Sequence, residues 1–282
     1  MFTAKEIADY YNTTQNHYQK WWKLNDNLSL HYGIWDEGIK SFDESLRNTN
    51  RILMELSGIT SADKVLDAGC GVGGAALFIA ETKNARVTGI TLSEKQVELA
   101  RQSAIHKNLT DKVAFELMDY THTSFADESF DVVWACESVS SVTDKNLFIK
   151  EAFRLLKKGG RLILSDFFQS VENQPDKHQW VKKWGATWGI SNFDTQKAFV
   201  KKLDAHGFIK INTINYTDKI EKSARRMYYA SLLGALPSEL YNLTHPRVSY
   251  FAKNHYKCGY YQYKALKNNL WQYFVVMAEK GV

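Results

Sequence analysis

Apolar residues in the middle of the chain fall into short runs separated by segments with helical spacing. Seven runs are rich in Val, Ile, Leu and Phe, at residues 64–70, 86–91, 113–119, 130–136, 161–167, 209–217 and 273–280. Short apolar runs bounded by glycines and polar residues predict strands, and nearly continuous apolarity is typical of strands covered on both faces.

The segments between these runs carry helix signals. Residues 41–58 and 93–108 begin with capping boxes, Ser41–Glu44 and Ser93–Gln96. The first helix has an apolar face at Ile52, Leu53 and Leu56 and a stop at Gly58. Another helix is predicted within 144–160, ending at Gly159 and Gly160, and a last one within 194–208, with Asp194 as cap and Gly207 as stop. The alternation predicts an α/β fold, a Rossmann-like, doubly wound, seven-stranded and mostly parallel sheet.

Three segments interrupt this alternation and suggest how the chain is divided. We expect an N-terminal helical lid at 1–58, a ligand-binding core at 59–218 that carries a cap segment at 170–193, a helical cap insertion at 219–268, and the last strand of the core at 269–282. Lids and caps on such cores are where acceptor specificity usually lies.

Composition narrows the functional classes. The 282 residues are 44% hydrophobic and 24% charged, as in globular proteins, and the net charge of +5 is spread without a basic run, which argues against a nucleic-acid partner. The three cysteines have no C-x-x-C partner and the chain begins without a signal peptide, so we expect a reduced, cytoplasmic protein. No apolar stretch is long enough to span a membrane, and no two histidines are spaced as metal ligands, so no metal is expected.

The stretch VLDAGCGVGG, residues 65–74, admits two interpretations. Gly69, Gly71 and Gly74 spell the G-x-G-x-x-G of a dinucleotide-binding turn, whereas Asp67, Gly69, Gly71 and Gly73 spell the D-x-G-x-G-x-G of S-adenosylmethionine (SAM) binders. A carboxylate at position 67 would repel a pyrophosphate but suits the ammonium and sulfonium of SAM. Proteins that bind dinucleotides or SAM often have an acidic residue about 20 positions later, which binds the ribose hydroxyls. This chain has Thr91 at that position instead.

Taken together, several motifs resemble class I SAM-dependent methyltransferases over roughly residues 30–168. They are VLDAGCGVGG, GITLSEKQ, LMDY, FDVVWACES and the N-terminal HYGIWDEG. The resemblance is greatest to the branch that methylates small lipophilic acceptors, the tocopherol, sterol, quinone and prenyl-diphosphate C-methyltransferases. It implies SAM as cofactor, with the ribose at Thr91, Leu92 and Gln96, the adenine at Met118, Asp119 and Tyr120, and the methionyl group at Tyr32 and Gly33.

The reacting methyl group is expected beyond the carboxyl ends of the fourth and fifth strands. Glu137, directly after the fourth, is the candidate base, with Tyr32 as a second catalytic candidate. The resemblance implies that a Glu at this position faces a carbocation in sterol and prenyl-diphosphate enzymes. The alternative for Glu137, capping the next helix or only binding the acceptor, stays open. The run ESVSSV also lacks the His that often follows in the tocopherol and sterol enzymes.

The lid and cap are rich in aromatic residues that suit a greasy acceptor or a developing positive charge. The substrate-pocket candidates are Trp35, Ser138, Trp184, Trp188, Arg226 and Tyr229. Further aromatic candidates are Tyr10, Tyr11, Tyr18, Trp21, Trp22, Tyr228, Tyr260 and Tyr261. For each ring, ordinary packing remains the alternative, and for the Arg225–Arg226 pair a solvated helix face does.

The sequence thus favours a SAM-dependent methyltransferase of a small lipophilic molecule, with carbon as the methylated atom. An O- or N-methyltransferase of a small polar or aromatic metabolite is the alternative, and an NAD(P)-dependent oxidoreductase is a weaker one. The identity of the acceptor and the formation of a homo-oligomer are left open.

Overall fold

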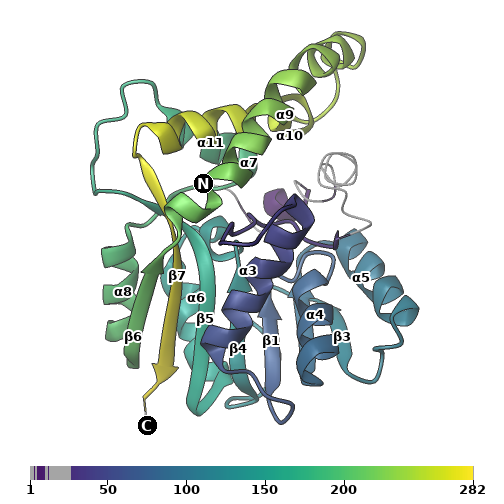
Figure 1. Ribbon diagram of the computed structural model, residues 1–282, viewed down its shortest axis with the longest axis vertical. Helices are drawn as coiled ribbons and strands as arrows, with labels where there is room; N and C mark the ends of the chain where they lie inside the picture. The colour runs from purple at the N-terminus through teal and green to yellow at the C-terminus, as the bar shows by residue number, and fades with distance from the viewer. Residues whose placement is uncertain (1–2, 4, 10–11, 13–26, 282) are drawn as a thin grey trace.

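The computed structural model describes residue 3, residues 5–9, residue 12 and residues 27–281. Its centre is a seven-stranded sheet with the order β3-β2-β1-β4-β5-β7-β6, in which β7 runs antiparallel to β5 and β6 and the other neighbouring strands are parallel (Figure 1). The predicted Rossmann-like fold is therefore confirmed.

The elements follow one another with short connections. The strands are β1 (Lys64–Ala68), β2 (Arg86–Thr91), β3 (Val113–Leu117), β4 (Phe130–Cys136), β5 (Leu156–Gln169), β6 (Phe208–Asn215) and β7 (Trp271–Lys280). The helices of the core are α3 (Phe42–Ser57), α4 (Gly74–Lys83), α5 (Glu94–His106), α6 (Lys145–Leu155) and α8 (Gln196–Ala205), with a 3₁₀ turn η1 (Val139–Ser141). The cap consists of α7 (Trp180–Trp188), α9 (Thr217–Thr244), α10 (Tyr250–Asn254), η2 (His255–Lys257) and α11 (Cys258–Lys267).

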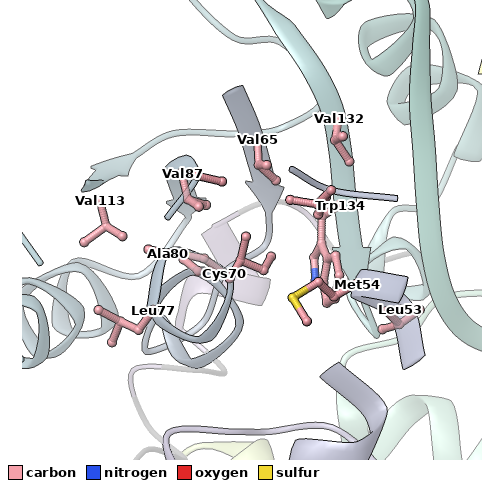
Figure 2. Close-up of a cluster of buried hydrophobic side chains, with 14 of the residues drawn as sticks. Leu53, Met54, Val65, Cys70, Leu77, Ala80, Val87, Val113, Val132 and Trp134 are labelled. Atoms are coloured by element: carbon pink, nitrogen blue, oxygen red, sulfur yellow. The ribbon is translucent and has the colours of Figure 1, made fainter. Parts of the chain in front are cut away.

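Successive side chains of each strand point to opposite faces, and each face has its own core. Val65 and Trp134 pack with Leu53 and Leu77 of α3 and α4 on one face (Figure 2). Their strand neighbours pack on the other face against α6 and α8. Because both faces are covered, the strands read as apolar runs rather than as alternating patterns.

The cap and the end of the N-terminal segment share a third, aromatic cluster. Trp184 of α7 packs on Phe193 and Trp271, with ring centroids 4.7 and 4.9 Å apart. Tyr32 and Phe167 join the same cluster. Helix α11 contacts both α7 and α9 above the carboxyl ends of the strands (Figure 1). No helix in residues 27–281 or 5–9 is long and apolar enough to cross a membrane.

Most of the predicted boundaries hold, but three local predictions are wrong. Leu56 is 37% exposed, and the buried face of α3 runs through Ile52, Leu53 and Met54 instead. Helix α6 ends at Leu155, before the two glycines, because Leu156 already pairs with Phe130 in the sheet.

The third concerns the cap of α8. Thr195, not Asp194, accepts the backbone N–H of Ala198 through its side chain. The carboxylate of Asp194 is instead bound by Lys202 Nζ at 2.5 Å. Both residues are good capping types, so the sequence did not separate them.

Helix α3, in the predicted N-terminal lid, packs against β5 and β7 and also holds the segment before it. Besides its apolar residues, α3 buries the polar side chains of Ser45, Asn48 and Thr49. Thr49 Oγ1 accepts the N–H of Ile34 and donates to the carbonyl of Tyr32, at 2.8 and 2.9 Å. These bonds pin residues 32–34 over the carboxyl ends of the strands.

Candidate functional site

A cavity of about 320 Å³ opens at the carboxyl ends of the strands, where the strand order reverses between β1 and β4. Its wall is formed by the turns after β1, β2, β3 and β4, by residues 28–31 from the N-terminal side, and by Phe167, Trp188 and Ile190. In open α/β sheets this switch point is where ligands bind. The volume is typical of a small-molecule site.

The turn from β1 into α4 offers backbone to the cavity. Gly73 is the N-cap of α4 with φ of +86°, and no side chain caps the helix. The N–H groups of the first turn of a helix are directed outward and attract an anion. Gly73 itself does not line the cavity, because the position of its missing Cβ lies 2.6 Å from Phe115 Cζ.

Gly74 has a role that neither interpretation of the glycine motif predicted. A Cβ at this position would lie 2.0 Å from the carbonyl oxygen of Leu28. The bare backbone therefore lets the N-terminal segment close over the turn. Leu28 and Leu30 then line the cavity beside Gly69 and Gly71.

Asp67 is buried beneath this turn and lines the cavity, with an exposed fraction of 2%. Burial raises the pKa of its carboxyl from 3.8 to about 7, and a hydrogen bond from the backbone of Ala76 opposes this shift only in part. Its Oδ2 has no hydrogen-bond partner among the described residues. A desolvated carboxylate oxygen facing a cavity is suited to a cationic ligand.

Thr91 and Gln96 meet at the end of β2. The Thr91 hydroxyl donates to Gln96 Oε1 at 2.7 Å, and Ser93 caps α5 by accepting the N–H of Gln96 at 3.2 Å. This fixes the Gln96 amide, whose buried Nε2 has no partner among the described residues. Thr91, Leu92 and Gln96 all line the cavity.

The next part of the wall follows β3. Asp119 and Tyr120 line the cavity, whereas Met118 packs into the core beneath it. Asp119 Oδ1 accepts the N–H and hydroxyl of Thr121, which leaves Oδ2 to face a ligand donor. The hydroxyl of Tyr120 donates to the carbonyl of Ser138 at 2.6 Å.

Glu137 follows β4 in a left-handed backbone conformation, with φ of +52°. Such strain in a non-glycine residue often marks a functional position. Its Oε1 accepts the backbone N–H of Tyr32 at 2.6 Å and the hydroxyl of Tyr273 at 2.7 Å. Its Oε2 is buried and without a partner among the described residues, and Glu137 lines the cavity.

Burial raises the pKa of the Glu137 carboxyl well above its usual range, against the two hydrogen bonds and with a smaller contribution from Asp166. Burial also raises the pKa of Tyr273, so its phenol stays protonated and donates. Glu137 thus connects β4, β7 and the segment before α3, and presents one oxygen to the cavity.

The predicted residues of the N-terminal segment that the structure describes lie behind the cavity wall, and Tyr32 alone among them binds Glu137. The Tyr32 ring is buried 5.4 Å from that of Phe167, and Gly33 lies against α3 and α9. Ser223 of α9 accepts the N–H groups of Gly33 and of the Trp35 side chain, at 3.1 and 3.0 Å. Neither Tyr32, Gly33 nor Trp35 lines the cavity.

The cavity wall near Glu137 includes the rings of Phe167 and Trp188, which pack on Tyr32. Further apolar residues of the wall are Ile190, Val142 and Leu147. Ser138 also lines the cavity, although its hydroxyl is used in a bond to the carbonyl of Ala68 at 2.6 Å.

Three other substrate-pocket candidates lie elsewhere. Trp184 is fully buried in the aromatic cluster, Arg226 stacks over Phe42, and Tyr229 is 56% exposed on α9. Among the further aromatic candidates, Tyr228, Tyr260 and Tyr261 also stand outside the cavity wall. Tyr10, Tyr11, Tyr18, Trp21 and Trp22 are outside the described residues.

A family model described as a methyltransferase domain matches residues 59–223. The chain belongs to this methyltransferase family. The match covers β1 to β6 and the start of α9, and so includes the turns that form the cavity.

Named relatives of the methyltransferase act on different molecules. It is 38% identical to 27-O-demethylrifamycin SV methyltransferase of Amycolatopsis mediterranei, over 58% of this chain and 59% of that protein. It is 33% identical to the chloroplastic tocopherol O-methyltransferase of Arabidopsis thaliana, over 77% of this chain and 66% of that one. The chain thus spans less than two thirds of the length of either relative.

A solved structure shares the whole fold of the methyltransferase. The [4+2]-cyclase SpnF matches with a TM-score of 0.81 at 22% identity, covering 99% of this chain and 97% of that one. At this level of identity the likeness shows the fold alone, and the chemistry has to be inferred from the residues of the site.

The cavity fits SAM on its own geometry. The uncapped N-terminus of α4 suits the carboxylate of the methionyl group, and Asp67 Oδ2 suits its ammonium. Gln96 Nε2 is a fixed donor for a ribose hydroxyl. No phosphate-binding side chain is needed by this set, and a dinucleotide would bring its pyrophosphate close to Asp67.

Sequence reasoning missed His31 in the wall of the cavity. Its Nδ1 lies 3.0 Å from the carbonyl of Tyr32, and burial lowers its pKa to about 4, which keeps the ring neutral. Its place in HYGIWDEG was the available signal. In the described part of the chain no group of three or more His, Cys, Asp or Glu is placed to hold a metal ion.

The loop 139–144 was also missed, although Ser140 to Asp144 line the cavity. Buried Lys145 holds it by donating to the carbonyls of Ser140 and Asn192, at 2.9 and 3.2 Å, and to that of Val142. Asp166 Oδ2 accepts the N–H of Ser140 at 2.8 Å. These bonds join segments distant in the sequence, so no local motif announces them.

Proposed function

We propose that the protein is a SAM-dependent methyltransferase of a small molecule. The observation that carries this proposal is one cavity with two separated carboxylates, Asp67 below the glycine turn and Glu137 beside an apolar end. Each presents a buried oxygen without a partner among the described residues. The family membership supports the same conclusion.

SAM, when bound, supplies a methyl group activated by a sulfonium. The residues of this chain orient it: the α4 N-terminus, Asp67, Gln96 and Asp119 hold its polar groups. The leucines at 28 and 30 close the N-terminal side of the cavity against water. Positioning of this kind lowers the barrier to methyl transfer, because the reaction needs in-line approach more than acid–base chemistry.

Glu137 serves as the base for an acceptor that must lose a proton. Its Oε2 would take the proton of an acceptor hydroxyl whose oxygen receives the methyl group. Hydrogen bonds from Tyr32 and Tyr273 to Oε1 hold the carboxyl group in place. A cationic ligand in the same cavity favours the ionised carboxylate and so offsets the effect of burial on its pKa.

The acceptor is lipophilic in this proposal, because Phe167 and Trp188 line the cavity near Glu137 and Ile190, Val142 and Leu147 add further apolar surface to its wall. Its methylated atom is a hydroxyl oxygen in this proposal, a choice supported by the names of the two relatives described above, the rifamycin methyltransferase and the tocopherol O-methyltransferase. Carbon, which the sequence favours, is the second candidate. It is supported by the rings of Phe167 and Trp188 near Glu137, since rings stabilise a developing cation.

The test is to incubate the protein with methyl-labelled SAM and an extract of the source cells, followed by partition between solvent and water. We expect label in the solvent phase, in a methyl ether that resists alkali. Glu137→Gln should reduce the transfer by about 10²–10⁴-fold, and the exposed Glu172→Gln should leave it unchanged. Label only on water-soluble amines would refute the lipophilic acceptor, and label on a carbon would decide for the second candidate.

A further inference from the structure

The distal half of α9 carries a continuous apolar stripe on its outer face. Its residues are Tyr229, Leu233, Leu236, Leu240 and Leu243, with exposed fractions of 56, 74, 70, 56 and 78%. Their spacing of four and three residues places them on one side of the helix. Monomeric proteins rarely expose a contiguous patch of this kind unless it binds something.

The stripe is not part of the packing of the cap. The opposite face of α9 is buried through Met227, Ser231 and Gly234, and Ser231 bonds the carbonyl of Tyr256 on η2 at 2.5 Å. This half of α9 projects away from the sheet, together with α10 (Figure 1). Leu232 is a further exposed leucine beside the stripe, at 47%.

Cations stand at both ends of the stripe. Arg225 is exposed and precedes Tyr229 by one turn on the same face, and Arg247 is exposed just after the end of α9. Lys253 lies nearby on α10, where its ammonium contacts the carbonyl of Pro246. Glu239 is the only acidic residue from 225 to 257, and it is engaged by Lys257 at 3.5 Å and by Tyr256.

This charge pattern favours an anionic lipid surface over a second copy of the chain as the binding partner of the stripe. A second copy paired antiparallel through the stripe would bring Arg225 of one chain against Arg247 of the other, and a parallel pair would oppose identical cations. Like charges at both ends disfavour pairing. An anionic lipid surface satisfies both ends at once, with leucines entering the acyl boundary and Tyr229, Tyr241 and Tyr250 at headgroup level.

We infer that the outer face of α9 docks the protein on an anionic lipid surface. The surface is separate from the cavity, and the inference does not depend on the proposed methyl transfer. Each buried leucine adds to the binding through its apolar area, and each cation near the surface adds an electrostatic attraction that salt weakens.

The experiment is co-sedimentation of the full chain with phosphatidylcholine vesicles that contain or lack phosphatidylglycerol. We expect binding to the anionic vesicles at least about tenfold tighter than to the neutral ones, and a decrease as salt is raised. The pair Leu233→Ser and Leu236→Ser should weaken binding by at least about tenfold. A matched pair at equally exposed sites on other elements, Ile105→Ser and Val171→Ser, 64 and 62% exposed, should leave it unchanged.

SAM titration and circular dichroism should be unaltered in both double variants, because the substituted side chains are exposed. Failure of the wild-type chain to bind anionic vesicles overturns the inference, as does equal weakening by the control pair. A dimer in sedimentation equilibrium that the leucine pair dissociates would assign the stripe to a second copy instead. None of these outcomes bears on methyl transfer, which is measured without vesicles.

Discussion

Replacing Asp67 with Asn should make the ligand-free protein more stable, increasingly so as the pH rises. Burial raises the pKa of this carboxyl from 3.8 to about 7, so the folded state favours the protonated form. A carboxyl with a raised pKa contributes its full stability below the unfolded value, and that contribution is lost as the pH rises through the folded value. Asn keeps the shape of the neutral carboxyl and has no charge to bury.

The two pKa values give the size of the effect. Compared with a carboxyl whose pKa is the same in both states, Asp67 lowers the free energy of unfolding by about 2 kcal/mol at pH 5.5 and by about 4 kcal/mol at pH 8. The advantage of Asp67→Asn therefore grows by about 2 kcal/mol between these pH values. For a chain of this size that corresponds to roughly 4 °C in melting temperature.

The assay is scanning calorimetry of both proteins without SAM at pH 5.5, 7 and 8. The change with pH is the quantity to compare, because an unpaired amide nitrogen in the variant costs the same at every pH. The exposed Asp111→Asn is the control and should show no such change. A constant difference between wild type and Asp67→Asn would refute the inference that Asp67 is held in a desolvated position for a cation.

Three further changes test the site. Glu137→Gln should keep SAM affinity and lower kcat for a hydroxyl acceptor by about 10²–10⁴-fold, and unchanged turnover in steady-state assays would remove Glu137 as the base. Tyr273→Phe removes the hydrogen bond from the phenol to Glu137 Oε1, so the pKa of Glu137 should rise. The acidic limb of the pH profile of kcat/KM should then shift upward by about one pH unit. An unshifted limb would show that another group is titrating. Gly74→Ala places a methyl group 2.0 Å from the carbonyl oxygen of Leu28 and should displace the N-terminal segment. We expect SAM binding to weaken about tenfold or more in calorimetric titration. An unchanged SAM affinity of the variant would show that closure of this segment over the turn is dispensable.

The fold was predictable because its signals are local. Alternating apolar runs and helical segments indicated the strands, and caps such as Ser41 and Ser93 marked helix starts that the structure confirms. The predicted capping box is also confirmed, since Ser41 accepts the N–H of Glu44 and the Glu44 carboxylate accepts from the backbone of Ser41 as well as from that of Lys40. Errors arose where two neighbouring polar residues could each cap a helix, as Asp194 and Thr195 could before α8.

The candidate site was predictable in part, for the same reason. The positions directly after β1, β2, β3 and β4 came from motifs, and the topology of the sheet brings them to one edge. The aromatic residues of the cap gave no such guide, because a ring at a helical spacing suits a core, a pocket or a surface equally. Trp184, Trp188 and Tyr229 occupy these three environments respectively.

Nothing in the sequence indicated which residues bind the Glu137 carboxylate. Tyr32 lies 105 residues before it and Tyr273 lies 136 residues after it, and only the closed sheet and the N-terminal segment bring them together. The same holds for Lys145 and Asn192, which fix the cavity loop across 47 residues.

Calorimetric titration of the purified protein with SAM at pH 6, in two buffers of different ionisation enthalpy, tests the central claim most directly. The account predicts one site and the release of a proton, because Asp67 must give up its proton to receive the ammonium. In Asp67→Asn the proton release should decrease and the affinity should fall. No heat with SAM, or saturable binding of NADH at the same site, would contradict the account.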